Sequence, residues 1–167
     1  MAVSLSLAKQ HLEYEDDDRD SLIAQYIGAA AAWVENHTGK VILQRTVVDT
    51  FECFGSFVEL LKGPLVSVTS VSYVDALEAP QSVTGYRVRG SRIYAPVAGW
   101  PSIADYSTIT VTYQAGYATT PADLVSAQLL LIGHYFQSRE AVNVATSVTE
   151  LPLAVESLCR PYRSVHV

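Results

Sequence analysis

The sequence predicts an α+β protein, in which a small helical bundle from the N- and C-terminal segments carries an inserted, mainly antiparallel β-sheet of short strands. Two observations predict this class. Apolar residues recur at steps of three and four near both ends of the chain, whereas the middle contains short runs in which apolar and polar residues alternate. We therefore expect N-terminal helices over residues 1–45, a β-rich insertion over 46–118, C-terminal helices over 119–161 and a tail over 162–167.

The N-terminal region predicts two helices. Ser4 or Ser6 can cap a short first helix. A longer helix follows the acidic run 13–18, which suits a helix start because the helix dipole favours negative charge there. Gly39 can end this helix in the left-handed conformation. The residues expected on its buried face are Leu22, Ile23, Tyr26, Ile27, Ala30, Trp33, Val34 and His37.

The other faces of the longer helix carry small side chains, among them Gly28, Ala29 and Ala32. In a free-standing domain such faces more often carry Lys and Glu, and small residues let a second surface approach closely. We therefore expect these three residues to contact a neighbouring copy of the chain.

The middle of the chain predicts a small sheet. The expected strands cover residues 46–53, 57–61, 66–74, 84–89, 92–95 and 108–113. The first two flank Gly55-Ser56 and are expected to pair as a hairpin, and a second hairpin is expected across Gly90-Ser91.

The chain then returns to helix. Thr119-Thr120-Pro121 is typical of a helix start, with a Thr cap followed by Pro in the first turn. Residues 143–149 are polar and predict a loop, after which a short last helix ends at Pro161. The apolar face of the third helix is expected to contain Leu124, Ala127, Leu130, Leu131, His134 and Tyr135.

Composition excludes several classes of function. The chain has eleven Lys and Arg and a formal net charge of −6, which disfavours duplex binding but suits a wall along which DNA slides. Only 17% of residues are charged, compared with roughly 25% in soluble domains. Such a chain has a large core or buries its surface against partners. We expect no signal peptide and no membrane span, and two reduced, buried thiols at Cys53 and Cys159.

The search for catalytic and metal-binding patterns predicts neither. The glycines are isolated at turns and form no phosphate loop, and the four histidines lie singly in different segments. Asp16-Asp17-Asp18 lacks the alternation and glycine of a calcium loop, so we interpret the run as helix-start electrostatics. We predict a non-enzymatic protein without a cofactor or metal. The alternative from another class is a small enzyme in the β insertion.

Two basic segments are candidate contact sites. Arg87, Arg89 and Arg92 form a cluster on the second hairpin, which is a solvated face, a contact to an acidic neighbour such as the first-helix region of an adjacent copy, or a DNA contact. The C-terminal tail is a frayed terminus or an extended peptide that adds a strand to a partner's sheet. Its candidate binding residues are Arg160, Tyr162, Arg163, Val165 and Val167.

Several segments, taken in order, resemble the head–tail connector proteins of tailed bacteriophages, also called adaptor or head-completion proteins. They include LSLAKQHL from residue 5, DDDRDSLI from 16, PLVSVTSVSYVD from 64, TVTYQAGY from 110 and LPLAVESL from 151. Further matching segments lie at residues 29–35, 38–40, 121–136, 139–141 and 161–163.

The resemblance implies a job. Such proteins form a ring, usually of twelve copies, beneath the portal protein. The ring extends the DNA channel without sequence-specific binding and docks the next stopper or tail component. Carried over to this chain, residues 158–167 would clasp the portal, in a virion assembled in the bacterial host cytoplasm. The alternative within this class is a tail-completion or stopper-layer protein one layer further down.

Overall fold

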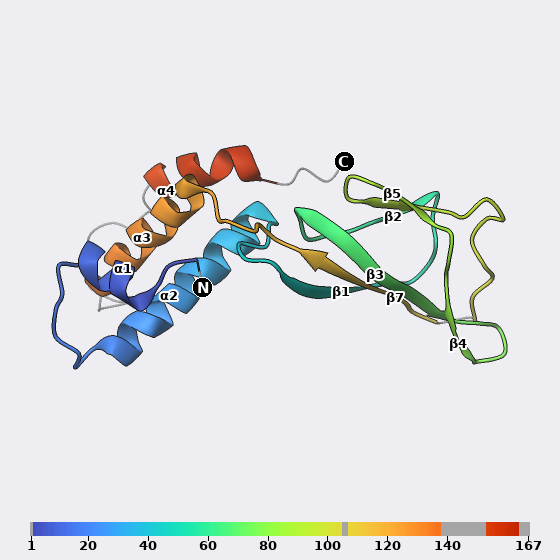
Figure 1. The fold of residues 1–167 in the computed structure, drawn as a ribbon, viewed down its shortest axis with the longest axis horizontal. Coiled ribbons are helices and arrows are strands. Elements are labelled where there is room, and N and C mark those ends of the chain that lie inside the picture. Colours follow the sequence, from blue (N-terminus) through green and yellow to red (C-terminus); the bar gives the residue numbers. More distant parts are fainter. Residues whose placement is uncertain (1, 105–106, 138–152, 164–167) are drawn as a thin grey trace, which may run out of the picture. The chain divides into compact units, whose positions relative to one another are not determined.

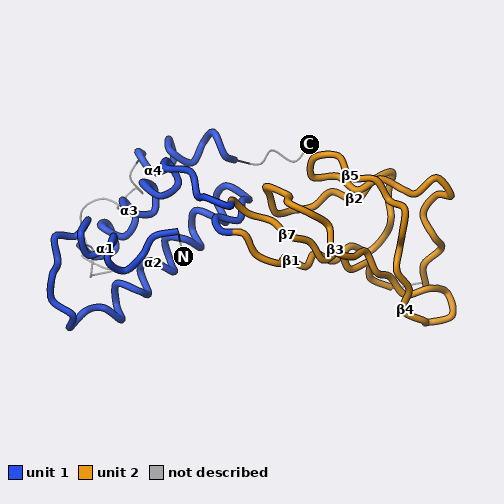
Figure 2. The backbone as a smooth tube through the Cα atoms, in the orientation of Figure 1, with its two compact units in different colours: residues 1–43, 118–167 blue, residues 44–117 orange. Residues whose placement is uncertain are grey.

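The computed structural model describes residues 2–104, 107–137 and 153–163 (Figure 1). The chain divides into two compact units (Figure 2): a helical unit of residues 1–43 and 118–167, and a β unit of residues 44–117. All strand pairs among the described residues are antiparallel. The predicted α+β class is confirmed.

Four helices and a final 3₁₀ turn make up the described part of the helical unit. They are α1 (Leu5–His11), α2 (Asp20–Thr38), α3 (Ala122–Gln137), α4 (Leu153–Cys159) and η1 (Arg160–Tyr162). α3 packs against both α2 and α4. The core contains Ala8, Ile23, Ile27, Ala30, Val34, Leu124, Ala127, Leu131, Ile132, Val155 and Cys159. Leu130, predicted on the buried face of α3, is instead 37% exposed.

The helix ends follow the predictions in part. Ser4 caps α1 by accepting a hydrogen bond from the Leu7 amide at 3.2 Å, and Gly39 ends α2 with φ 68°. The N-cap position of α2 is Arg19, which makes no side-chain cap bond. Thr120, predicted within the cap of α3, donates its hydroxyl to the Ile42 carbonyl oxygen at 3.0 Å. The predicted loop over residues 143–149 lies outside the described residues.

The β unit contains two sheets among its described residues. The strands are β1 (Arg45–Phe51), β2 (Phe57–Glu59), β3 (Leu65–Val74), β4 (Pro80–Ser82), β5 (Arg87–Arg89), β6 (Arg92–Tyr94) and β7 (Ile109–Ala115). One sheet has the order β1-β7-β3-β4 and the other β2-β6-β5. The largest fully buried side chains of the β unit are Tyr113, Leu60, Ile93 and Ile109.

One predicted hairpin is confirmed and the other is wrong. β5 and β6 pair across Gly90, which has φ 58°. β1 and β2 do not pair with each other, because β1 pairs over its whole length with β7, from Arg45 opposite Ala115 to Phe51 opposite Ile109. β2 pairs instead with β6 in the second sheet. The long ladder with β7 gives β1 more backbone hydrogen bonds than a three-residue partner offers.

Two further features of the described residues concern the expected thiols and membrane spans. Cys159 is buried, but Cys53 is exposed, so the prediction of two buried thiols is wrong for Cys53. No helix in the described ranges combines the length and the apolar character that crossing a membrane requires.

Candidate interaction surfaces

The outward face of α2 is small and uncharged. Gly28, Ala29 and Ala32 are all exposed, opposite the buried Ile23, Ile27 and Ala30. A side chain built at Gly28 would meet no atom within 4 Å. The other exposed residues on this side are Ser21, Ala24, Gln25 and Asn36. The predicted small face is therefore accessible within the helical unit.

The predicted basic cluster lies on one face of the three-stranded sheet. In the strand register Arg87 faces Tyr94 and Arg89 faces Arg92. Directly opposite residues share a face, so these four side chains lie together, and we call them the arginine face. Phe57 and Glu59 of β2 join the same face, opposite Tyr94 and Arg92. The alternate residues Val58 and Ile93 are buried on the other side.

The three arginines of this face differ in their partners. The Arg92 guanidinium lies 4.4 Å from the centre of the Phe57 ring, and its Nε is 3.4 Å from Glu59 Oε1. Arg87 and Arg89, by contrast, make no ion pair within the described part of the chain. With Tyr94 they line a pocket of about 320 Å³. Two cationic groups of the arginine face are thus available to an anion.

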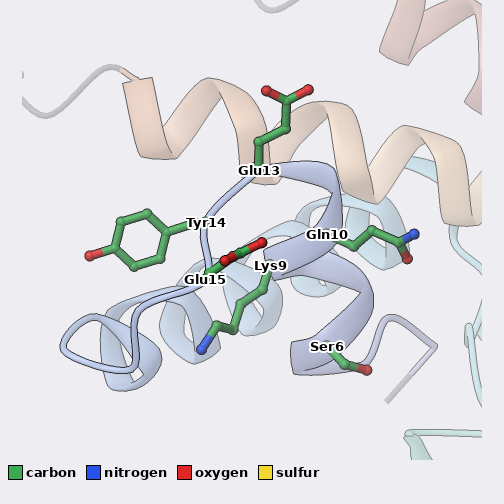
Figure 3. A pocket seen from close by; sticks show the side chains of 6 residues that line it. All are labelled: Ser6, Lys9, Gln10, Glu13, Tyr14 and Glu15. Atoms are coloured by element: carbon green, nitrogen blue, oxygen red, sulfur yellow. The ribbon is translucent and has the colours of Figure 1, made fainter.

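A second pocket lies beside α1 and the acidic run (Figure 3). Its volume is about 670 Å³, and it is lined by Ser6, Lys9, Gln10, Glu13, Tyr14 and Glu15. The Lys9 ammonium lies 2.6 Å from Asp17 Oδ1 and 2.8 Å from Asp20 Oδ1, and its side chain is only 15% exposed. Hydrogen bonds to these two carboxylates raise the pKa of Lys9, and the hydrogen bond from Lys9 lowers the pKa of Asp17. Lys9 therefore ties α1 to the start of α2.

The same segment is anchored a second time by aromatic contacts. The Arg19 guanidinium lies 5.1 Å from the centre of the Tyr14 ring and 5.8 Å from that of Phe136. The Tyr14 hydroxyl donates to Asp18, which raises the pKa of Tyr14. Sequence reasoning missed Lys9 and Arg19, although basic residues beside a run of acids are the available sign of such pairing.

Three acidic residues of this segment have no ion pair among the described residues. Glu13, Glu15 and Asp16 are exposed and make no ion pair to any residue that the structure describes. Glu13 adopts φ 51°, and in Figure 3 its carboxylate stands apart from the other labelled side chains. We call these three residues the carboxylate segment.

The first of the candidate binding residues near the C-terminus belong to the helical unit. Tyr162 belongs to η1, and its hydroxyl donates to Asp123 Oδ2 of α3 at 3.1 Å. Arg160 and Arg163 are exposed. Val165 and Val167 lie outside the described residues. Tyr162, predicted as the first residue of a free tail, is thus attached to α3.

The described residues contain no group of three or more His, Cys, Asp or Glu side chains arranged to hold a metal ion. Their distinctive side chains lie on outward faces of helices and strands, where a protein contacts other macromolecules. These outward faces are the candidate interaction surfaces of the chain.

Comparison with known proteins identifies the family. The profile of the head completion protein family matches residues 3–165, so the chain belongs to this family, as the sequence predicts. No curated protein sequence matches the chain significantly.

Similar solved structures come from gene transfer agent (GTA) particles. A chain from the neck of an empty GTA particle computed with C6 symmetry has a TM-score of 0.82 and 25% identity. A chain from the virion of a native GTA particle has a TM-score of 0.81, and one from a native neck computed with C12 symmetry has 0.80, each with 26% identity. Each alignment covers 99% of this chain and 91% of the other.

Proposed function

We propose that this chain is a structural subunit at the head–tail junction of a tailed phage or phage-like virion. There, copies form a closed ring beneath the portal protein, extend the DNA channel and dock the next stopper or tail component. The observation that carries this proposal is the similarity along 99% of the chain, at a TM-score of 0.82, to a chain from a GTA neck. The subunit works by assembly and catalyses no reaction.

Symmetry and charge support the ring. The similar neck structures were computed with C6 and C12 symmetry, which suits the twelve copies that the resemblance implies. A ring protomer needs two unlike surfaces that meet head-to-tail. The small face of α2, with Gly28, Ala29 and Ala32, is proposed as one of them. The net charge of −6 suits a channel that DNA must pass without adhering.

The C-terminal residues are proposed as the portal contact. Arg160 and Arg163 are exposed cations at the end of the described helical unit, and Tyr and Arg are enriched at binding hot spots. Tyr162 is proposed to take part in this contact from its place in η1, and Val165 and Val167 are proposed to extend the contact to a partner's sheet edge.

Electron microscopy of particles assembled with and without this protein tests the location. We expect a ring of density directly below the portal that is present only with the protein. Density one layer further down would contradict the adaptor position and support the stopper-layer alternative.

A tail variant tests the portal contact. Removing residues 164–167 together with Arg160→Glu and Arg163→Glu should abolish portal binding while the circular dichroism spectrum stays unchanged. Tyr162 is kept because its bond to Asp123 supports the helical unit. The matched control, Arg87→Glu with Arg89→Glu, should bind isolated portal protein normally in a pairwise assay with single copies, which needs no contact between neighbouring copies. Unchanged portal binding by the tail variant would contradict this contact.

A further inference from the structure

We propose that the arginine face binds the carboxylate segment of a second copy of this chain, with Arg87 and Arg89 of one copy paired to Glu13, Glu15 and Asp16 of the next. This inference rests on the proposed function, because a ring requires two unlike surfaces of the chain to meet between neighbouring copies. It names the charged part of the contact between copies.

The arginine face carries more positive than negative charge. Glu59 is already paired with Arg92, so the face carries three cations and one anion. Arg87 and Arg89 lie on the same side of β5, an edge strand whose three residues are all exposed. Guanidinium groups bind carboxylates through paired hydrogen bonds, and the neighbouring Tyr94 hydroxyl can donate another. The 320 Å³ pocket between these side chains has room for a carboxylate side chain.

The carboxylate segment is the matching anion. The other acids of the run have partners: Asp17 and Asp20 pair with Lys9, and Asp18 accepts from Tyr14. The three that remain are exposed, and they lie in the segment between Lys9 and Arg19, the two residues that anchor it. Because these anchors order the backbone before binding, the entropy lost on association is small.

A protein partner fits this face better than a nucleic acid. Binding to a DNA backbone depends on neutralising many phosphates. This face offers two guanidinium groups that have no ion pair among the residues that the structure describes, in a chain of net charge −6. Two such groups suffice for a short acidic peptide. Every copy of the chain supplies one such peptide, at the stoichiometry that a ring needs.

A peptide titration tests the contact without a ring. The probe is a fluorescent peptide of residues 12–19, and its control replaces Glu13, Glu15 and Asp16 by the matching amides. We expect the full chain to bind the acidic peptide, with affinity that falls as salt rises, and to bind the amide peptide about tenfold more weakly. The R87E/R89E variant should lose a similar factor, whereas R160E/R163E, with the same charge change, should not.

Three results of the titration would overturn the inference. In the first, the wild-type chain and R87E/R89E bind the acidic peptide equally. In the second, the wild-type chain binds the acidic and amide peptides equally. In the third, the chain does not bind the acidic peptide, but it binds a DNA oligonucleotide through Arg87 and Arg89. The last result would assign the face to nucleic acid.

A mixing experiment tests whether the contact joins two copies. R87E/R89E and E13K/E15K chains should each give particles without a neck ring, and a one-to-one mixture should restore it, because alternating copies present complementary charges at every junction. A ring formed by either variant alone would overturn a contact between copies. The contact would also be overturned if the mixture forms no ring while a chain carrying all four changes does form one. If wild-type chains give no ring, the proposed function fails, and the peptide titration still decides the inference.

Discussion

Single buried polar residues determine how the β unit is closed. Asp49 of β1 is only 9% exposed, and it accepts hydrogen bonds from the Leu61 amide at 3.0 Å and from the Tyr113 hydroxyl at 2.7 Å. The same hydroxyl accepts from the Lys62 amide at 3.2 Å. A buried carboxylate is tolerated only when donors surround it. The network therefore fastens the chain that follows β2 to β1 and β7.

Tyr113→Phe tests this network. The change removes one donor from Asp49 and leaves the Lys62 amide without its acceptor, so we expect a loss of about 1–2 kcal/mol in the free energy of unfolding. Chemical denaturation measures it. Tyr73→Phe is the matched control, since the Tyr73 hydroxyl has no hydrogen bond among the described residues, and it should change stability by less than about 0.5 kcal/mol.

The same variant has a signature in pH. Burial, and then the hydrogen bond to Asp49, raises the pKa of Tyr113 above its ordinary value of 10.0. The folded chain therefore holds the phenol proton more tightly than the unfolded chain, so stability falls as pH rises above about 10. Tyr113→Phe should make this fall shallower. It should not remove it, because burial also raises the pKa of Tyr117 and Tyr135. An unchanged slope would contradict the assignment.

At the scale of elements, α2 joins a packed face to an open one. Its inner face supplies Ile23, Ile27 and Val34 to the core, while Gly28 lies on the exposed side. The helix ends at Gly39 in the left-handed region, where a Cβ is unfavourable. Two glycines in one element thus have opposite roles: Gly39 is required by the backbone, whereas Gly28 weakens the helix of the free chain.

Substitution of these two glycines should give opposite results. Gly39→Ala should lower the free energy of unfolding by about 1 kcal/mol, because alanine is strained at φ 68°. Gly28→Ala should raise it by up to about 1 kcal/mol, because helix propensity improves and the added methyl meets no atom within 4 Å. Thermal denaturation of the two variants measures both. A Gly28→Ala variant less stable than wild type would show that the added methyl group meets neighbouring atoms.

At the scale of the whole molecule, each unit is closed at the points where the chain leaves it. In the β unit the Gln44 amide donates to the Tyr117 carbonyl oxygen at 3.3 Å, just outside the pairing of Arg45 with Ala115. In the helical unit the Thr120 hydroxyl bonds the Ile42 carbonyl oxygen. Because both ends of residues 44–117 lie together and the unit has its own core, the insertion has the character of an independent folding unit.

Excision of the insertion tests that independence. Residues 44–117 expressed alone should give a β-type circular dichroism spectrum and a cooperative thermal transition. Residues 1–43 joined to 118–167 through a short Gly-Ser linker should give a helical spectrum. The absence of a cooperative transition in the excised β unit would mean that it folds only as part of the full chain.

Local order is what the sequence predicted well. Helical periodicity placed α2 and α3, alternation placed β3 and β7, and Gly39 and Gly90 marked a helix end and a hairpin turn. These features depend on residues close together in the chain, where spacing and backbone preference are sufficient evidence. Family membership was predicted in the same way, from many weak local segments in a fixed order.

Partner choice was decided only by the tertiary structure. Alternation shows which face of a strand is buried but not which strand lies beside it, so β1 was assigned to β2 rather than to β7. Likewise three arginines look equivalent along the chain, and only the cross-strand register gives Glu59 to Arg92 and leaves Arg87 and Arg89 without an ion pair among the described residues. Contacts between distant segments depend on the whole set of competing pairings, which spacing along the chain does not encode.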